Sequence, residues 1–208
     1  MSVLSKLACV QGRKDETLNQ ELAKELARKN DKQGVKEIVE NIWNKDKKIQ
    51  NDCIGVMEYL GHARSELIED YVLDFLKLLH STSNRLVWGG MIALSIIADR
   101  KSEEIFQHLS EIIQAMEKGS VITVDNGIKT LAAVASAREE YNVKIFPFLI
   151  DHLKKCRSKD VPQHAESIEC AVNKANREEF LLVLSSREKE LSSSQRARIK
   201  KVYKRLKE

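Results

Sequence analysis

Two histidines and two cysteines in the last third of the chain have side chains that could bind a metal ion. His152 and Cys156 are four positions apart on one expected helix, and His164 and Cys170 are six apart on the next. Antiparallel pairing of these helices would bring the four side chains together as tetrahedral zinc ligands. However, the helical period places His164 and Cys170 on different faces, and a free cysteine commonly acts as a buried hydrophobic residue. The sequence alone therefore assigns no metal and no cofactor.

No other arrangement of reactive residues indicates catalysis. The paired glutamates 103–104, 139–140 and 178–179 fall where helices are expected to begin, and negative charge is favourable at a helix N-terminus. Gly89 and Gly90 lie within an apolar helical stretch rather than between a strand and a helix, so they do not form a phosphate-binding loop. The sequence favours a protein without enzymatic activity.

The composition predicts an all-α fold. The chain has 208 residues, of which 42% are hydrophobic, and it contains only two prolines and eight glycines. The commonest residues are mainly straight-chain helix formers. Because its length is that of one sizeable domain, residues 1–208 are expected to form a single repeat domain.

Charge and hydropathy limit the possible partners. The formal net charge is +4, so the predicted surface is mixed, which neither requires nor excludes nucleic acid. No apolar run approaches the roughly 20 residues that a membrane span requires, so we expect no membrane partner and, by default, a cytoplasmic location. The four dispersed cysteines are expected to be reduced thiols. The oligomeric state is not predicted.

Four segments with small residues at both ends recur along the chain. The small residues are Gly55 and Ala63, Gly90 and Ala98, Gly127 and Ala135, and Ser167 and Ala175. The intervals between segments are about 35, 37 and 40 residues, which is typical of helix-pair repeats. The segment 84–100 is then a central buried helix whose glycines allow close helix packing.

Each repeated segment is followed by a second amphipathic helix. These are expected at 67–80, 103–118, 141–156 and 178–190, with Pro147 in the first turns of its helix. Asn30 and Asp31 predict the end of one helix and the N-cap of the next. A capping helix is expected at 191–208, and residues 1–14 are either a docked helical turn or a frayed end.

These columns resemble HEAT-like or armadillo-like repeats over about residues 48–190. The resemblance implies an α-α superhelix, a right-handed solenoid of about five antiparallel helix pairs. Among HEAT-like families, the bacterial alkylpurine DNA glycosylases use tryptophans, an aspartate and an arginine on a concave basic surface. The residues here that could correspond are Trp43, Trp88 and Asp125.

The second helices of such an array form an exposed concave surface that binds extended partners. Both tryptophans are expected to pack in the core or between repeats, with a groove-lining position as the alternative for Trp88. We therefore expect a non-enzymatic scaffold that binds a protein or peptide, and a DNA-binding protein or alkylpurine glycosylase is the alternative. The candidate binding residues on the second helices are His80, Gln107, His108, Glu111, Gln114, Asp151, His152, Lys154 and Lys155.

Overall fold

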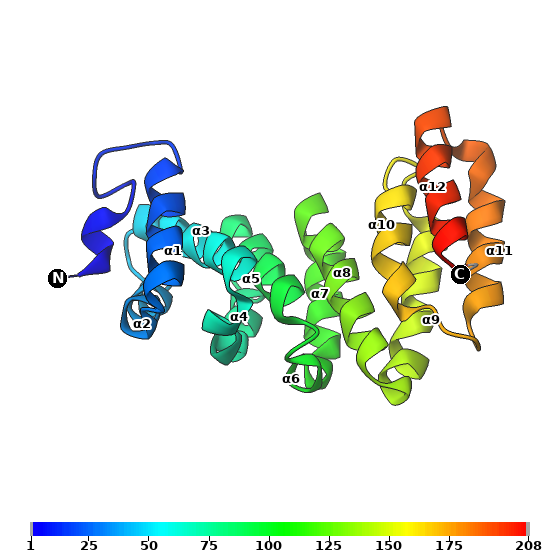
Figure 1. The fold of residues 1–208 in the computed structure, drawn as a ribbon, viewed down its shortest axis with the longest axis horizontal. Helices are drawn as coiled ribbons and strands as arrows, with labels where there is room; N and C mark the ends of the chain where they lie inside the picture. The colour runs from blue at the N-terminus through cyan, green and yellow to red at the C-terminus, as the bar shows by residue number, and fades with distance from the viewer. Residues whose placement is uncertain (1, 207–208) are drawn as a thin grey trace. The chain divides into compact units, whose positions relative to one another are not determined.

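The computed structural model describes residues 2–206, which fold into α-helices and short 3₁₀ turns without a β-strand (Figure 1). The all-α prediction is confirmed. The α-helices are α1 (Thr17–Lys29), α2 (Lys32–Asn41), α3 (Lys47–Ala63), α4 (Val72–Leu78), α5 (Asn84–Ile97), α6 (Ser102–Gln107), α7 (Leu109–Lys118), α8 (Val121–Ala137), α9 (Glu139–Lys155), α10 (Val161–Ile168), α11 (Arg177–Arg187) and α12 (Ser193–Arg205). The 3₁₀ turns are η1 (Val3–Lys6), η2 (Ser65–Leu67), η3 (Glu69–Tyr71), η4 (Glu169–Ala171) and η5 (Glu188–Glu190).

The chain forms two compact units, Met1–Asn126 and Gly127–Glu208, which we call the N-terminal and C-terminal units. Each has its own buried apolar residues, such as Phe75 in the first and Phe180 in the second. The expectation of a single domain over 1–208 stays a prediction.

The start of the N-terminal unit is a docked turn rather than a frayed end. Leu7 is fully buried, and the Ala8 amide donates to Asn19 Oδ1 at 3.0 Å. The Cys9 amide donates to Asp52 Oδ2 at 2.7 Å. These bonds satisfy backbone donors that have no helical partner, and they hold the turn against α1 and α3.

The predicted boundary between the first two helices is confirmed. Asn30 ends α1 in the left-handed conformation with φ 51°, a conformation that asparagine tolerates better than most residues. Asp31 then caps α2 by accepting a hydrogen bond from the Gly34 amide at 2.9 Å.

Helix α5, the expected central helix, packs against both α3 and α4. A Cβ atom added at Gly90 would lie 2.8 Å from Leu78 Cβ and 2.9 Å from the Phe75 carbonyl oxygen. A Cβ added at Gly89 would lie 2.5 Å from Ile54 Cγ1. Both glycines therefore permit close helix contacts, as the sequence predicts.

Several second helices are shorter or more broken than expected. Two 3₁₀ turns, η2 and η3, precede α4, and the helix predicted at 103–118 is divided into α6 and α7. His108 stands at the break with φ −108° and ψ 22°. The periodicity of apolar residues continues through both breaks, so it does not reveal them.

The helical segment predicted at 167–175 is wrong. Helix α10 ends at Ile168, and residues 172–176 form a loop. The buried Asn142 side chain donates to the Ala171 carbonyl at 2.7 Å and accepts from Asn176 Nδ2 at 2.9 Å. These side-chain bonds take the place of the helical backbone pattern.

Pro147 also lies elsewhere than predicted. Helix α9 begins at Glu139, so this proline is in the middle of the helix rather than in its first turns. It removes the amide that would bond to the Val143 carbonyl. Both residues are exposed, Val143 by 69%, so water can reach that carbonyl.

Over residues 2–206, no helix has the combined length and apolar character needed to span a bilayer. Cys9, Cys53, Cys156 and Cys170 are free thiols.

Candidate functional site

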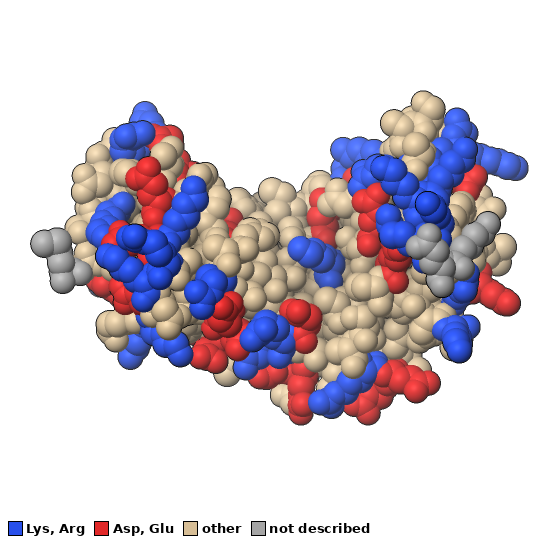
Figure 2. Space-filling view, in the orientation of Figure 1, with Lys and Arg blue, Asp and Glu red and all other residues tan. Residues whose placement is uncertain are grey.

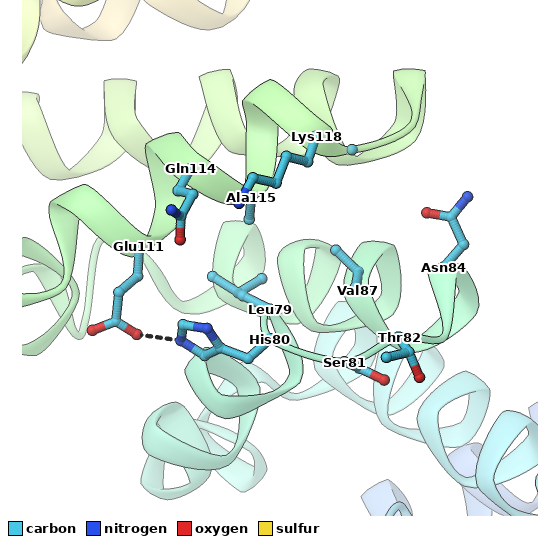
Figure 3. Close-up of a pocket in the computed structure, with 11 residues that line it drawn as sticks. Leu79, His80, Ser81, Thr82, Asn84, Val87, Glu111, Gln114, Ala115 and Lys118 are labelled. Atoms are coloured by element: carbon cyan, nitrogen blue, oxygen red, sulfur yellow. Dashed lines mark hydrogen bonds and ion pairs between the residues drawn. The ribbon is translucent and has the colours of Figure 1, made fainter.

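A surface pocket of about 370 Å³ lies within the N-terminal unit, between the end of α4, the start of α5 and helix α7 (Figure 3). We call it the α4–α7 pocket. Three apolar groups meet in it: Leu79, the C-cap residue of α4, Val87 of α5 and Ala115 of α7. Polar and charged groups surround them: His80, Ser81, Thr82, Asn84, Glu111, Gln114 and Lys118, with Gly119 completing the lining.

Local sequence signals explain how the loop side of the pocket forms. The Leu79, His80 and Ser81 amides bond to carbonyls of the last turn of α4, which closes that helix. Ser81 Oγ then accepts from the Ser83 amide at 3.1 Å, the two-residue bond typical of a serine turn. Helix α5 begins at Asn84, so its first side chains project beside the loop.

A carboxylate with two imidazole partners forms one end of the pocket. His80 Nε2 lies 2.7 Å from Glu111 Oε2, and His108 Nδ1 lies 2.7 Å from Glu111 Oε1. These hydrogen bonds, first from His80 and then from His108, hold the pKa of the Glu111 carboxyl below its usual value. Glu111 is therefore an ionised acceptor at neutral pH, and its His80 partner remains 55% exposed.

The nine predicted binding residues separate between the two units. His80, Glu111 and Gln114 line the α4–α7 pocket, and His108 contacts Glu111. Gln107 is exposed at the end of α6.

The other four predicted binding residues belong to α9 and its partners in the C-terminal unit. Lys155 Nζ pairs with Asp151 Oδ2 at 2.8 Å, and Lys154 Nζ pairs with Glu179 Oε1 at 3.2 Å. His152 Nε2 lies 3.0 Å from His164 Nδ1. His152 therefore belongs to a local cluster with His164.

The sequence does not reveal most of the pocket lining. The segment 81–84 and the segment 118–120 carry turn residues, which predict repeat boundaries but not a shared cavity. Leu79, Val87 and Ala115 look like ordinary core positions in the helical pattern. The signal available in the sequence is the recurrence of polar turns next to the ends of second helices.

The tryptophans occupy different environments. Trp88 is half-buried, and the Arg85 guanidinium lies 3.9 Å from the centre of its ring. Arg85 Nη1 also pairs with Glu58 Oε1 at 2.6 Å, and this cation opposes the burial that raises the pKa of Glu58. Trp88 is thus part of a packed cation–π and ion-pair cluster.

Trp43 is not in the core as expected, because 38% of its surface is exposed. It follows the end of α2, and the Lys77 ammonium lies 4.5 Å from its ring centre. Asp125, the carboxylate considered for a DNA glycosylase, is half-buried in α8 and does not line the α4–α7 pocket.

The surface charges are mixed. Figure 2 shows Lys and Arg beside Asp and Glu over much of the visible face. In the C-terminal unit, Arg198 pairs with Glu166 at 2.6 Å, and Arg205 pairs with Glu169 at 2.5 Å. Two arginines of α12 are thereby paired with carboxylates of α10 and η4.

No family model and no curated protein matches the sequence. The fold is similar to that of an engineered protein, with a TM-score of 0.69 and 19% identity over 100% of this chain and 97% of that one. A designed armadillo repeat protein in complex with the peptide (KR)4 has a TM-score of 0.70 and 13% identity, over 97% of this chain and 90% of that chain. The karyopherin Kap121p bound to the SUMO protease Ulp1p has a TM-score of 0.71 and 15% identity, and the match covers 98% of this chain but 23% of Kap121p.

The helices and these similarities define the class of protein. The chain has the all-helical repeat fold of armadillo and HEAT proteins. Two of the similar structures are complexes with a peptide or a protein.

Proposed function

We propose that this protein is a non-enzymatic repeat scaffold that binds a protein or peptide, and that the α4–α7 pocket receives part of an extended segment of that partner. The observation that supports this proposal most directly is the combination of apolar residues with neutral hydrogen-bonding groups in one pocket. Ligand sites commonly combine an apolar lining with a few polar groups that fix orientation.

The neutral polar groups suit a peptide backbone. Asn84 and Gln114 are exposed, and each carboxamide can donate and accept hydrogen bonds at the same time. A peptide bond offers one donor and one acceptor, so either carboxamide can satisfy both. Leu79 and Val87 would then contact an apolar side chain of the partner.

The charged groups favour a partner of mixed composition. Glu111 offers negative charge at one end of the pocket, and Lys118, the last residue of the same helix, offers positive charge (Figure 3). A continuous run of phosphates would meet the Glu111 carboxylate, whereas a peptide can place a basic residue there. The pocket therefore favours a peptide over a nucleic acid backbone.

Peptide selection tests the proposal. A displayed peptide library is selected against the full-length protein, and the recovered peptides are synthesised and titrated by fluorescence anisotropy. Gln114→Ala should weaken their binding about fivefold through the loss of roughly 1 kcal/mol of hydrogen bonding. Gln33→Ala is the matched control, because Gln33 is an exposed helical glutamine in α2 outside the pocket.

Two results would contradict the proposal. One is that no selected peptide binds the protein when it is synthesised and titrated in solution. The other is equal affinity of such peptides for wild type, Gln114→Ala and a double variant Asn84→Ala/Gln114→Ala, which would place binding outside the α4–α7 pocket.

A further inference from the structure

Three potential metal ligands converge in the C-terminal unit, where α9 ends and α10 begins. They are His152, Cys156 and His164, and their ligand atoms all lie within 4.8 Å of one another. His152 is in the last turn of α9, Cys156 is its C-cap residue, and His164 is in the first turns of α10. The short connection between the two helices brings the three together.

The two imidazoles already lie edge to edge. His152 Nε2 and His164 Nδ1 are 3.0 Å apart, and the ring centroids are 4.8 Å apart with the planes tilted by 54°. At this separation one nitrogen donates a hydrogen bond to the other. Both nitrogens therefore point toward the same small volume, where a cation could replace the shared proton.

The cysteine is held in place by the end of its helix. Its amide donates to the His152 carbonyl at 2.8 Å, and its carbonyl accepts from Arg187 Nη2 at 2.7 Å. Its thiol donates to the Leu153 carbonyl, with Sγ 3.6 Å from that oxygen. Arg187 is itself paired with Glu190 at 3.0 Å, which offsets its positive charge near a metal.

The geometry suits a small tetrahedral ion after modest adjustment. Zinc bonds of about 2.0–2.1 Å to nitrogen and 2.3 Å to sulfur imply ligand atoms roughly 3.3–3.6 Å apart. The imidazole nitrogens must separate by a few tenths of an ångström, and the farthest of the three atoms must approach by roughly 1 Å. Side-chain rotation in the half-exposed His152 and Cys156 supplies such movements without breaking either helix.

Cys170 is not part of this arrangement. Its sulfur lies 3.4 Å from the Ser167 carbonyl in the turn that follows α10, and its side chain is outside the cluster. The protein therefore contributes three ligands at this place.

We propose that His152, Cys156 and His164 form a site for Zn²⁺, with a water molecule as the fourth ligand. Two imidazoles and one thiolate are ligands that zinc prefers, whereas magnesium and calcium prefer oxygen. The bound ion links α9 to α10 and stabilises the folded C-terminal unit by mass action. The site does not depend on the α4–α7 pocket.

Metal titration of the full-length protein after removal of metal by a chelator tests the site. Wild type is expected to bind one equivalent of Zn²⁺ with an increase in thermal stability. Co²⁺ used as a spectroscopic probe should show the intense visible bands of a tetrahedral ion and a thiolate-to-cobalt charge-transfer band. Cys156→Ser should abolish the charge-transfer band, and it and His152→Gln should each weaken Zn²⁺ binding by at least about tenfold.

Cys170→Ser is the matched control, because this cysteine lies outside the cluster, beside Ser136 and the first turn of α9; it should bind both ions like wild type. Circular dichroism establishes that each variant is folded, and His152→Gln provides a second test if Cys156→Ser is not. The proposal is overturned if wild type binds no Zn²⁺ at micromolar concentration, or if Co²⁺ gives no thiolate band. Equal binding by the folded Cys156→Ser or His152→Gln variant and by Cys170→Ser would overturn it too.

Discussion

Arg187 is a buried cation whose hydrogen bonds terminate a neighbouring helix. Its Nη1 donates to the Leu153 and Lys154 carbonyls at 2.8 and 2.7 Å, and its Nη2 donates to the Cys156 carbonyl. The last carbonyls of a helix have no partner within the helix, so Arg187 satisfies two of those in α9 and the carbonyl of its C-cap residue, Cys156.

Replacing Arg187 should therefore lower the stability of the fold. Arg187→Met keeps much of the side-chain volume but removes the guanidinium donor from the three carbonyls, while the exposed Glu190 carboxylate keeps its hydrogen bond from Ser158 Oγ. We expect a loss of about 3 kcal/mol in the free energy of unfolding. Urea denaturation followed by circular dichroism measures it. Arg198→Met is the control, since Arg198 makes an exposed ion pair that should contribute less than about 1 kcal/mol. Equal effects of the two substitutions would contradict this role of Arg187.

Gly90 shows how one missing side chain can set a helix contact. A methyl group there would meet the Leu78 side chain and the Phe75 carbonyl within 2.9 Å, and backbone cannot move aside as a flexible side chain can. Gly90→Ala should destabilise the protein by about 1–3 kcal/mol despite the better helix propensity of alanine.

Gly55→Ala provides the comparison for Gly90→Ala. The added methyl would meet only the Arg85 guanidinium at 3.3 Å, the far end of a flexible side chain. We expect this change to be neutral or stabilising by up to about 1 kcal/mol. If thermal unfolding shows Gly90→Ala to be as stable as Gly55→Ala, close packing of α5 on α4 does not explain the glycine.

At the scale of whole elements, local signals in the sequence are reliable where short-range bonds decide the structure. Asp31 caps α2 as predicted, and Ser192 caps α12 in a capping box with Gln195. The end of α10 and the break at His108 depend instead on contacts with residues distant in sequence or on local backbone geometry, which the apolar periodicity does not encode. For the same reason the residues predicted on the second helices include Glu111 and Gln114, which line the α4–α7 pocket, but none of its apolar residues; their role in binding stays a prediction.

Helix α9 contains an internal proline, and this predicts a gain in stability on its removal. Pro147→Ala restores an amide that can bond to the Val143 carbonyl, and it removes the clash of the proline ring with that turn. The unfolded alanine variant has more conformational entropy to lose on folding, which offsets part of this stabilisation. We therefore expect the free energy of unfolding to rise by about 1–2 kcal/mol. Urea denaturation would show it as a higher midpoint with an unchanged slope. A destabilised variant would mean that the packing of α9 in the C-terminal unit requires the proline.

At the scale of the whole molecule, the balance of charge limits the binding of nucleic acid. The net charge of +4 is small, and the basic residues Arg198 and Arg205 of α12 are paired with Glu166 and Glu169. Protein–DNA affinity depends on basic side chains that can displace counterions from phosphates, and paired arginines are poorly available for this. We therefore expect binding to duplex DNA with a dissociation constant of about 10⁻⁵ M or weaker at about 150 mM salt.

Releasing these arginines should raise the DNA affinity in a defined way. Glu166→Gln/Glu169→Gln should make the plot of log K against log salt steeper by up to about 2, one unit for each freed arginine. The double variant Glu139→Gln/Glu178→Gln has the same net charge but alters glutamates in the first turns of α9 and α11, so it should leave that slope nearly unchanged. Fluorescence anisotropy with unmodified and methylated-purine duplexes measures all three proteins. Tight, strongly salt-dependent binding of the methylated duplex by wild type would contradict the expected weak binding. It would favour the DNA glycosylase alternative, because such binding requires a basic DNA-binding surface.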